Sequence, residues 1–99
     1  MFIMNKKRTC IIKPTSIYLR DSKTERDKVD ICAVEFGNDV YLLGTYDSEY
    51  ANKELEDIYT SLSDSKETYK MSSDKDVEEY YIRQKELEEF KKESEGILF

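Results

Sequence analysis

The sequence predicts an α+β fold in one domain, with an antiparallel β-sheet in the first part and two helices after it. Three observations carry this prediction. Short runs of β-branched and aromatic residues fill residues 9–43, where Pro14 and glycine-containing turns separate them. Residues 48–62 and 74–95 instead place apolar side chains at helical spacing. A chain of 99 residues suffices for a single domain with a modest core.

The sheet is expected to contain three or four strands. Residues 9–13 form a first run, which ends at Pro14 because proline cannot donate a hydrogen bond to a neighbouring strand. Residues 16–20 form a second run of the same kind. Residues 21–28 contain no apolar side chain and are expected to connect it to the next strand.

A β-hairpin over residues 29–43 is the clearest prediction. Its turn contains Gly37 and Asn38, which accept the positive φ angles that tight hairpin turns need. The returning strand, residues 40–43, is apolar throughout, so we expect it in the centre of the sheet, covered by a helix. Gly44 is expected to end this strand.

The first helix is expected over residues 48–62. Asp47 or Ser48 can accept a hydrogen bond from a free N–H of its first turn and so cap it. Glu54, with Glu56 and Asp57, lies off the apolar stripe. That stripe is expected to cover the sheet, and it consists of Ala51, Leu55, Ile58, Tyr59 and Leu62.

The second helix is expected over residues 74–95, after the polar stretch 63–73, in which residues 69–71 can add a short strand. Gly96 is expected to follow the helix as its C′ residue. The helix carries nine acidic and five basic side chains, and its apolar stripe is thin, so it should be largely exposed. The stripe consists of Val77, Tyr80, Tyr81, Leu87 and Phe90.

The eight tyrosines divide between core and surface in this interpretation. Tyr41 and Tyr59 are expected in the core. Tyr80 and Tyr81 straddle the thin stripe, so one of them is expected to be exposed. Exposed aromatic rings beside charges are typical of binding surfaces, whereas packing against the sheet is the alternative for both rings.

The charge is divided unevenly along the chain. Residues 1–45 form the sheet part and carry a net charge of +2, whereas residues 46–99 form the helical part and carry −8. This asymmetry disfavours direct contact with nucleic acid and favours a partner protein with a basic surface. A solvated face that only maintains solubility is the alternative. The candidate partner-binding residues are Asp76, Glu78, Glu79, Tyr80, Tyr81, Glu86, Glu88 and Glu89.

The composition argues against catalysis. The chain has no histidine, which is the commonest general base and neutral metal ligand. Its three glycines stand apart, so no glycine-rich phosphate loop exists. Cys10 and Cys32 form no CxxC pair and are expected to be buried, reduced thiols, with a disulfide as the alternative. We therefore expect a non-enzyme with no catalytic residue, no metal site and no cofactor.

The ends of the chain suggest location and assembly. No signal peptide is evident and no apolar run approaches the length needed to cross a bilayer, so we expect a cytoplasmic protein with no membrane contact. The last three residues, Ile97, Leu98 and Phe99, are unusually apolar for a free end. They are the candidate residues for self-association into a homodimer.

The stretch from Tyr41 to Glu49, YLLGTYDSE, followed by Leu55 to Ile58, resembles small uncharacterised proteins of phages and prophages of low-GC Gram-positive bacteria. Those proteins have a strand that ends in Leu-Gly-x-Tyr and then a serine-capped helix. As a class, small acidic α+β phage proteins resemble anti-CRISPR and other anti-defence inhibitors. This resemblance of type implies a host-cell cytosol location and transfers no binding residue to the present chain.

Three functions follow from these observations. The first is a phage-type inhibitor whose acidic helix binds a basic, nucleic-acid-handling surface of a host defence protein. The second is a sponge that sequesters a nucleotide-derived immune signal, with Arg20, Arg26, Arg83 and Tyr81 as its candidate residues. The third is a small self-assembling regulatory protein.

Overall fold

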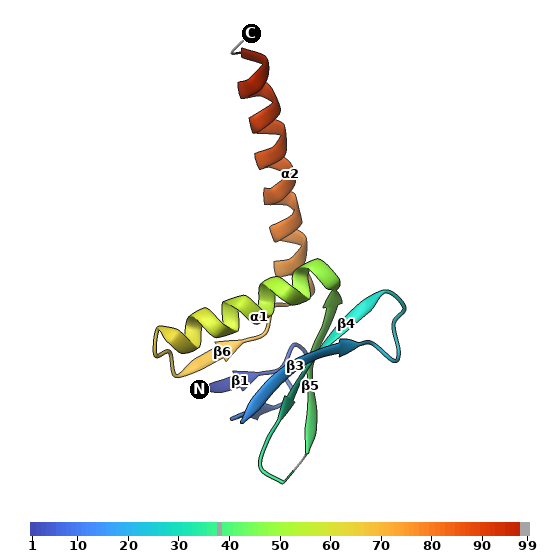
Figure 1. Ribbon diagram of the computed structural model, residues 1–99, viewed down its shortest axis with the longest axis vertical. Coiled ribbons are helices and arrows are strands. Elements are labelled where there is room, and N and C mark those ends of the chain that lie inside the picture. Colours follow the sequence, from blue (N-terminus) through green and yellow to red (C-terminus); the bar gives the residue numbers. More distant parts are fainter. Residues whose placement is uncertain (38, 98–99) are drawn as a thin grey trace.

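The computed structural model describes the backbone of residues 1–37 and 39–97, and the side chains as far as residue 91. It confirms the α+β fold, with six strands and two helices. The strands and the first helix form a body, and the second helix projects from it (Figure 1). The elements are β1 (Phe2–Met4), β2 (Ile11–Ile12), β3 (Ser16–Asp21), β4 (Lys28–Val34), β5 (Val40–Asp47), α1 (Ser48–Ser63), β6 (Thr68–Lys70) and α2 (Asp74–Ile97).

The strands form two sheets of three strands each. One sheet has the order β3-β4-β5 and is antiparallel throughout. The other has the order β2-β1-β6, in which β1 pairs antiparallel with β2 and parallel with β6. A parallel pair needs a long crossover connection, and here the rest of the body lies between the two strands in sequence. The sequence interpretation missed β1 because it has only three residues and its partner β6 is distant.

The hairpin of β4 and β5 is confirmed, with Val34 opposite Val40 and a turn in which Gly37 has a φ of +94°. β5 does not end at Gly44 as predicted, but continues to Asp47. Gly44 is needed for another reason: a Cβ at this position would lie 2.8 Å from the ring of Tyr46. The glycine thus marks a close approach of a side chain within the strand.

The prediction that residues 40–43 occupy the centre of the sheet is also wrong. β4 is the central strand and β5 lies at the edge. The apolar residues 40–43 do not alternate in the ordinary way because the strand contains a β-bulge. Cys32 pairs with Leu42 and Ile31 with Gly44, so Leu43 is an extra residue in β5. The bulge turns Leu43 into the core, where it is 1% exposed.

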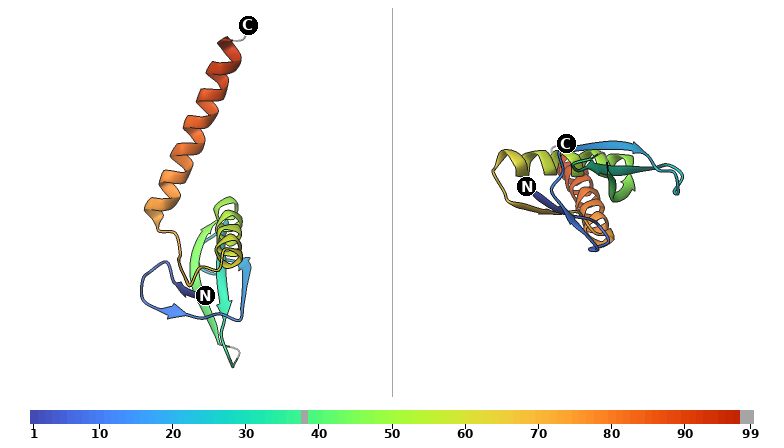
Figure 2. Two further views of the ribbon diagram at one scale, coloured as in Figure 1. Left: turned by 90° about the vertical axis from the view of Figure 1, so that its left-hand side faces the viewer. Right: turned by 90° about the horizontal axis from the view of Figure 1, so that it is seen from below.

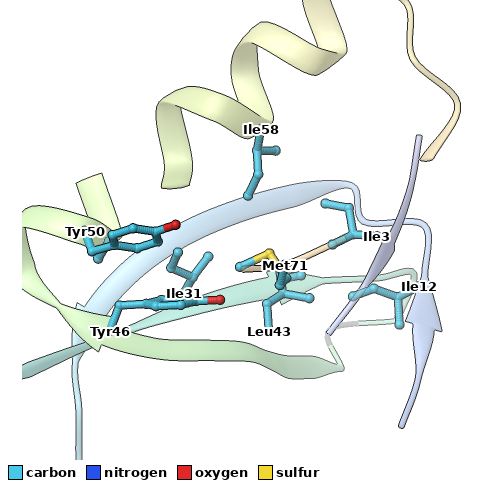
Figure 3. Close-up of a cluster of buried hydrophobic side chains, with 10 residues drawn as sticks. Ile3, Ile12, Ile31, Leu43, Tyr46, Tyr50, Ile58 and Met71 are labelled. Atoms are coloured by element: carbon cyan, nitrogen blue, oxygen red, sulfur yellow. The ribbon is translucent and has the colours of Figure 1, made fainter. Parts of the chain in front are cut away.

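The core lies between α1 and the two sheets (Figure 3). Ile3 from β1 and Met71 from the segment after β6 meet Ile31 and Leu43 from the other sheet there. The two sheets therefore share one core. The buried apolar cluster consists of Ile3, Ile12, Ile31, Ala33, Leu43, Tyr46, Tyr50, Ala51, Ile58 and Met71.

Helix α1 begins as predicted, but a different face of it is buried. Asp47 is the N-cap, and its side chain accepts a hydrogen bond from the N–H of Tyr50. Tyr59 is 70% exposed, so its predicted place in the core is wrong, and Leu62 is 57% exposed. The buried positions are instead Tyr50, Ala51, Glu54, Ile58 and Ser61. The buried face is thus turned toward Glu54 relative to the predicted stripe, and the Glu54 side chain accepts hydrogen bonds inside the body.

Helix α2 projects from the body, and the molecule is therefore elongated, measuring 61 × 34 × 19 Å (Figures 1 and 2). Ser73 and Asp76 cap its start reciprocally: the Ser73 N–H donates to Asp76 Oδ2, and the Asp76 N–H donates to Ser73 Oγ. The helix runs to Ile97, so Gly96 lies within it and is not the predicted C′ residue. Neither of the described helices has the length and apolar character that would let it cross a membrane.

Candidate interaction helix and its anchor

The base of α2 is fixed to α1 by aromatic side chains. Tyr80 meets the Tyr50 ring edge-on, with 5.3 Å between ring centroids. Tyr81 lies beside it, and its hydroxyl donates a 2.5 Å hydrogen bond to Asp47 Oδ1. Both rings are half-buried, so the prediction that one of them is exposed is wrong. These two candidate residues hold the helix in place and leave its other side free.

The segment that leads into α2 is held by three side chains of the body, which meet at Ser72. The hydroxyl of Tyr46 donates to the Ser72 carbonyl oxygen at 2.7 Å. The hydroxyl of Tyr50 bonds to Ser72 Oγ at 2.9 Å, and the Ser72 N–H donates to Glu54 Oε1 at 3.2 Å. One residue thus connects β5 and α1 to the start of the projecting helix.

Glu54 is fully buried, although its charge and its place off the predicted stripe suggested a surface position. Its Oε1 accepts hydrogen bonds from the Tyr69 hydroxyl and the Ser72 N–H. Burial raises the pKa of the Tyr69 hydroxyl, and the bond to Glu54 raises it further. Tyr69 therefore remains a protonated donor. Oε2 of Glu54 has no hydrogen-bond partner among the described residues.

Two lysines complete the anchor. Lys6 pairs with Asp74 at 2.6 Å and lies 4.7 Å from the ring centroid of Tyr46. The hydrogen bond from Lys6 lowers the pKa of Asp74. Lys53 lies about equally far from two ring centroids, 5.1 Å from that of Tyr50 and 5.0 Å from that of Tyr80. Cations above aromatic faces add to the attachment of α2.

Beyond Tyr81 the described part of α2 is exposed on all sides, including its large apolar residues. Ile82, Leu87 and Phe90 are 49%, 54% and 67% exposed. Side chains four apart on a helix lie in one row, and Glu78, Ile82, Glu86 and Phe90 follow at this interval. We call these four residues the outer row. Two apolar side chains thus alternate with two carboxylates along it.

The remaining candidate acids are distributed around the outer row. Glu79 and Glu89 border it on its two sides, three residues from Ile82 and from Glu86 respectively. Glu88 is seven residues from Tyr81 and therefore lies on the same side of the helix as Tyr81, away from the outer row. Asp76 is engaged in the cap described above. Of the self-association residues, Leu98 and Phe99 and the side chain of Ile97 lie outside the described part of the structure.

The residues suggested for a nucleotide sponge are not gathered in one place. Arg20 pairs with the buried Asp30 at 3.3 Å on the β3-β4 sheet. Arg83 lies on α2, at a shallow cavity of about 240 Å³ that neither Arg20 nor Arg26 lines. Among the residues that the structure describes, no three Asp, Glu or Cys side chains are placed to hold a metal ion.

An apolar groove of about 470 Å³ runs between α1 and the strands β1 and β3. Leu55, Tyr59 and Leu62, which belong to the predicted apolar stripe of α1, line one wall of this groove. Met1 and Ile17 belong to the opposite wall. The groove is distant in sequence from the candidate residues, and no sequence signal identified it.

No family model matches the chain, and neither a curated protein nor a solved structure matches it. The candidate site is therefore defined by geometry alone: a helix anchored at its base that presents a row of alternating apolar and acidic side chains.

Proposed function

We propose that this protein is a non-catalytic binding protein that inserts the outer row of α2 into an apolar groove with a basic rim on a partner protein. The observation that carries the proposal is the exposure of Ile82 and Phe90 in the same row as Glu78 and Glu86. Ile82 and Phe90 are eight residues apart, so they lie within about 80° of each other around the helix axis. Apolar side chains on one side of a helix are what such helices bury in a groove. The flanking carboxylates select a partner whose groove is bordered by lysine and arginine.

The anchor supports this role. A protruding helix is held in one direction by Tyr81, Tyr80 and the bonds at Ser72, so the row is already oriented before a partner arrives. A pre-oriented surface loses less conformational entropy on binding. The distal turns of α2 have no packing partner within the described body and gain stability from one, because isolated helices are marginal in water.

The class of partner follows from the charge and from the resemblance to small phage proteins. A surface that handles nucleic acid is basic, and a negatively charged helix complements it. We therefore propose a nucleic-acid-handling protein of a host defence system as the partner, with the present protein as its inhibitor. Sequestration of a nucleotide is the second candidate, because Lys53 and Arg83 line the cavity of about 240 Å³ together with Tyr50 and Tyr80, although Asp76 and Glu79 line it too.

The test compares two neighbouring acids of α2 that differ only in the side they face. Partners are captured from a bacterial lysate, identified by mass spectrometry and purified for titration. Glu89→Lys is expected to weaken binding about tenfold or more, with a strong dependence on salt. Glu88→Lys changes the net charge equally but lies away from the outer row, and is expected to change affinity much less.

Circular dichroism of both variants controls for folding. Equal losses in the two variants would show that the whole helix acts as a diffuse charge, which contradicts a role for the row. Unchanged affinity in Glu89→Lys, or in Phe90→Ala, would refute the proposal altogether. Phe90→Ala removes the most exposed apolar side chain of the row and leaves the charge untouched.

A further inference from the structure

The sheet β2-β1-β6 has an outer face that the body leaves uncovered. Successive residues of a strand point to opposite faces, and Ile3 points into the core. Its neighbours Phe2 and Met4 therefore point outward, and Ile11 does so too, because it lies opposite Met4 in the register. Phe2 is 50% exposed and Ile11 60% exposed.

The same face is basic. Lys13 lies over the Phe2 ring, with its Nζ 5.8 Å from the ring centroid. Lys70 is the register partner of Met4 in the parallel pair, so it points to the same side, and it is exposed. We call Phe2, Met4, Ile11, Lys13 and Lys70 the outer sheet face. It contains two lysines and no acidic side chain among the described residues.

The outer sheet face and the outer row of α2 are complementary. One combines Phe2 and Ile11 with lysines, and the other combines Ile82 and Phe90 with glutamates. From Glu78 to Phe90 the row is about 18 Å long. The three strands span about 10 Å between the outer two, so the row is long enough to cross all of them.

The two surfaces of one molecule point in different directions. α2 extends away from the body, and the strands β1 and β2 lie within the body, away from the free end of α2 (Figure 2). The exposed turns of α2 therefore cannot reach the sheet of their own chain while the anchor holds. A second copy can supply the matching surface.

We propose that the outer sheet face is a docking site for the outer row of α2 of a second copy. The pair then contains two equivalent contacts, each between the helix of one copy and the sheet of the other. This inference rests on the proposed role of α2 as a docking helix, and it assigns a second use to that helix. Self-association covers the outer row and competes with the partner protein.

The test uses charge exchange between the two surfaces. The full chain is expected to form dimers in sedimentation velocity, and added salt should weaken them. Glu78→Lys/Glu86→Lys makes both surfaces basic, and Lys13→Glu/Lys70→Glu makes both acidic. Each variant alone is expected to dissociate about tenfold more readily or worse. An equimolar mixture of the two variants is expected to dimerise again, because every contact is then between opposite charges.

The outcomes separate this inference from the proposed function. A monomeric full chain, or a dimer that survives Lys13→Glu/Lys70→Glu, overturns the inference. Failure of the mixture to restore dimers overturns it as well, once circular dichroism shows both variants folded. Lys13 directly follows β2 and Lys70 ends β6, and neither belongs to the outer row, so partner capture that still depends on Glu89 would leave the proposed function standing in each of these cases.

Discussion

The Tyr69 hydroxyl donates a 2.5 Å hydrogen bond to Glu54 Oε1, which connects β6 to α1 within the core. A buried carboxylate is costly unless its oxygens are bonded, because burial removes it from water. Tyr69 and the Ser72 N–H supply such bonds to Oε1, whereas Oε2 has no hydrogen-bond partner among the described residues. The pair thus determines which face of α1 is buried, and so where β6 and the start of α2 lie.

Tyr69→Phe and Glu54→Gln are each expected to lower the free energy of unfolding by about 1–3 kcal/mol, because each leaves a buried polar atom with a weaker partner or none. In a double-mutant cycle the two changes should couple by about 1 kcal/mol or more. Tyr59→Phe removes a hydroxyl from an exposed ring and should change stability by less than about 0.5 kcal/mol. Urea denaturation measures all four variants, and additive effects would contradict the coupling.

Acid is expected to loosen the attachment of α2 at Asp47. Burial acts to raise the pKa of this carboxyl, but hydrogen bonds from the Tyr81 hydroxyl and the Tyr50 N–H outweigh it, and the pKa falls below its ordinary value of 3.8. A lowered carboxyl pKa means that the stabilisation is complete above the ordinary value and is lost as pH falls through the folded value. The same direction holds for Asp74 and Asp76.

Tyr81→Phe should therefore cost about 1 kcal/mol near neutral pH and clearly less once Asp47 is protonated. Stability measured across this range tests the expectation, with Tyr80→Phe as the neighbouring control that leaves Asp47 untouched. A loss for Tyr81→Phe that is the same at both extremes of pH would show that its hydroxyl does not act through Asp47.

Gly44→Ala is expected to be strongly destabilising. The added methyl group would lie 2.8 Å from Cε2 and 2.9 Å from the hydroxyl oxygen of Tyr46. That ring cannot easily move, because it is 2% exposed and bonded to Ser72. Overpacking of this kind costs about 1–3 kcal/mol. Gly37→Ala meets no atom within 4 Å and should cost about 1 kcal/mol, from its positive φ alone.

Leucine-to-alanine substitution is expected to affect stability very differently in the body and in the exposed part of α2. Leu43→Ala removes a side chain that is 1% exposed and should cost about 2–5 kcal/mol. Leu87 is 54% exposed, and Leu87→Ala should change stability by less than about 0.5 kcal/mol. Thermal unfolding distinguishes the two variants. A large loss in Leu87→Ala would mean that the distal part of α2 is already packed against a neighbouring molecule.

Local chemistry made much of the fold predictable. The hairpin could be predicted because Gly37 lies between two runs of β-branched and apolar residues. Helix α1 could be predicted because Asp47, a capping residue, precedes apolar residues at helical spacing. The burial of Glu54 could not be predicted, because its partners Tyr69 and Ser72 lie 15 and 18 residues further along the chain. A pattern of apolar residues says nothing about such distant partners, so it placed Leu55 and Tyr59 in the core instead.

The candidate site could be predicted only in part, because some of its residues depend on partners that are distant in the sequence. The acids of α2 are visible in the sequence, and helical spacing alone separates Glu88 from the outer row. The roles of Tyr80 and Tyr81 depend on Tyr50 and Asp47, which belong to the other helix and its cap. Only the assembled body shows that these aromatic rings fix the helix and that Ile82 and Phe90 stay free.

The parallel pairing of β1 with β6 has a consequence for how the chain emerges from the ribosome. Phe2 pairs with Thr68, more than sixty residues later, so β1 waits unpaired on this edge until most of the chain has been synthesised. Contacts between such distant residues slow folding. The hairpin and α1 can form earlier, because their contacts are local. The second sheet is complete only once residues 68–70 are present, and Ser72, whose contacts orient α2, follows them in the chain.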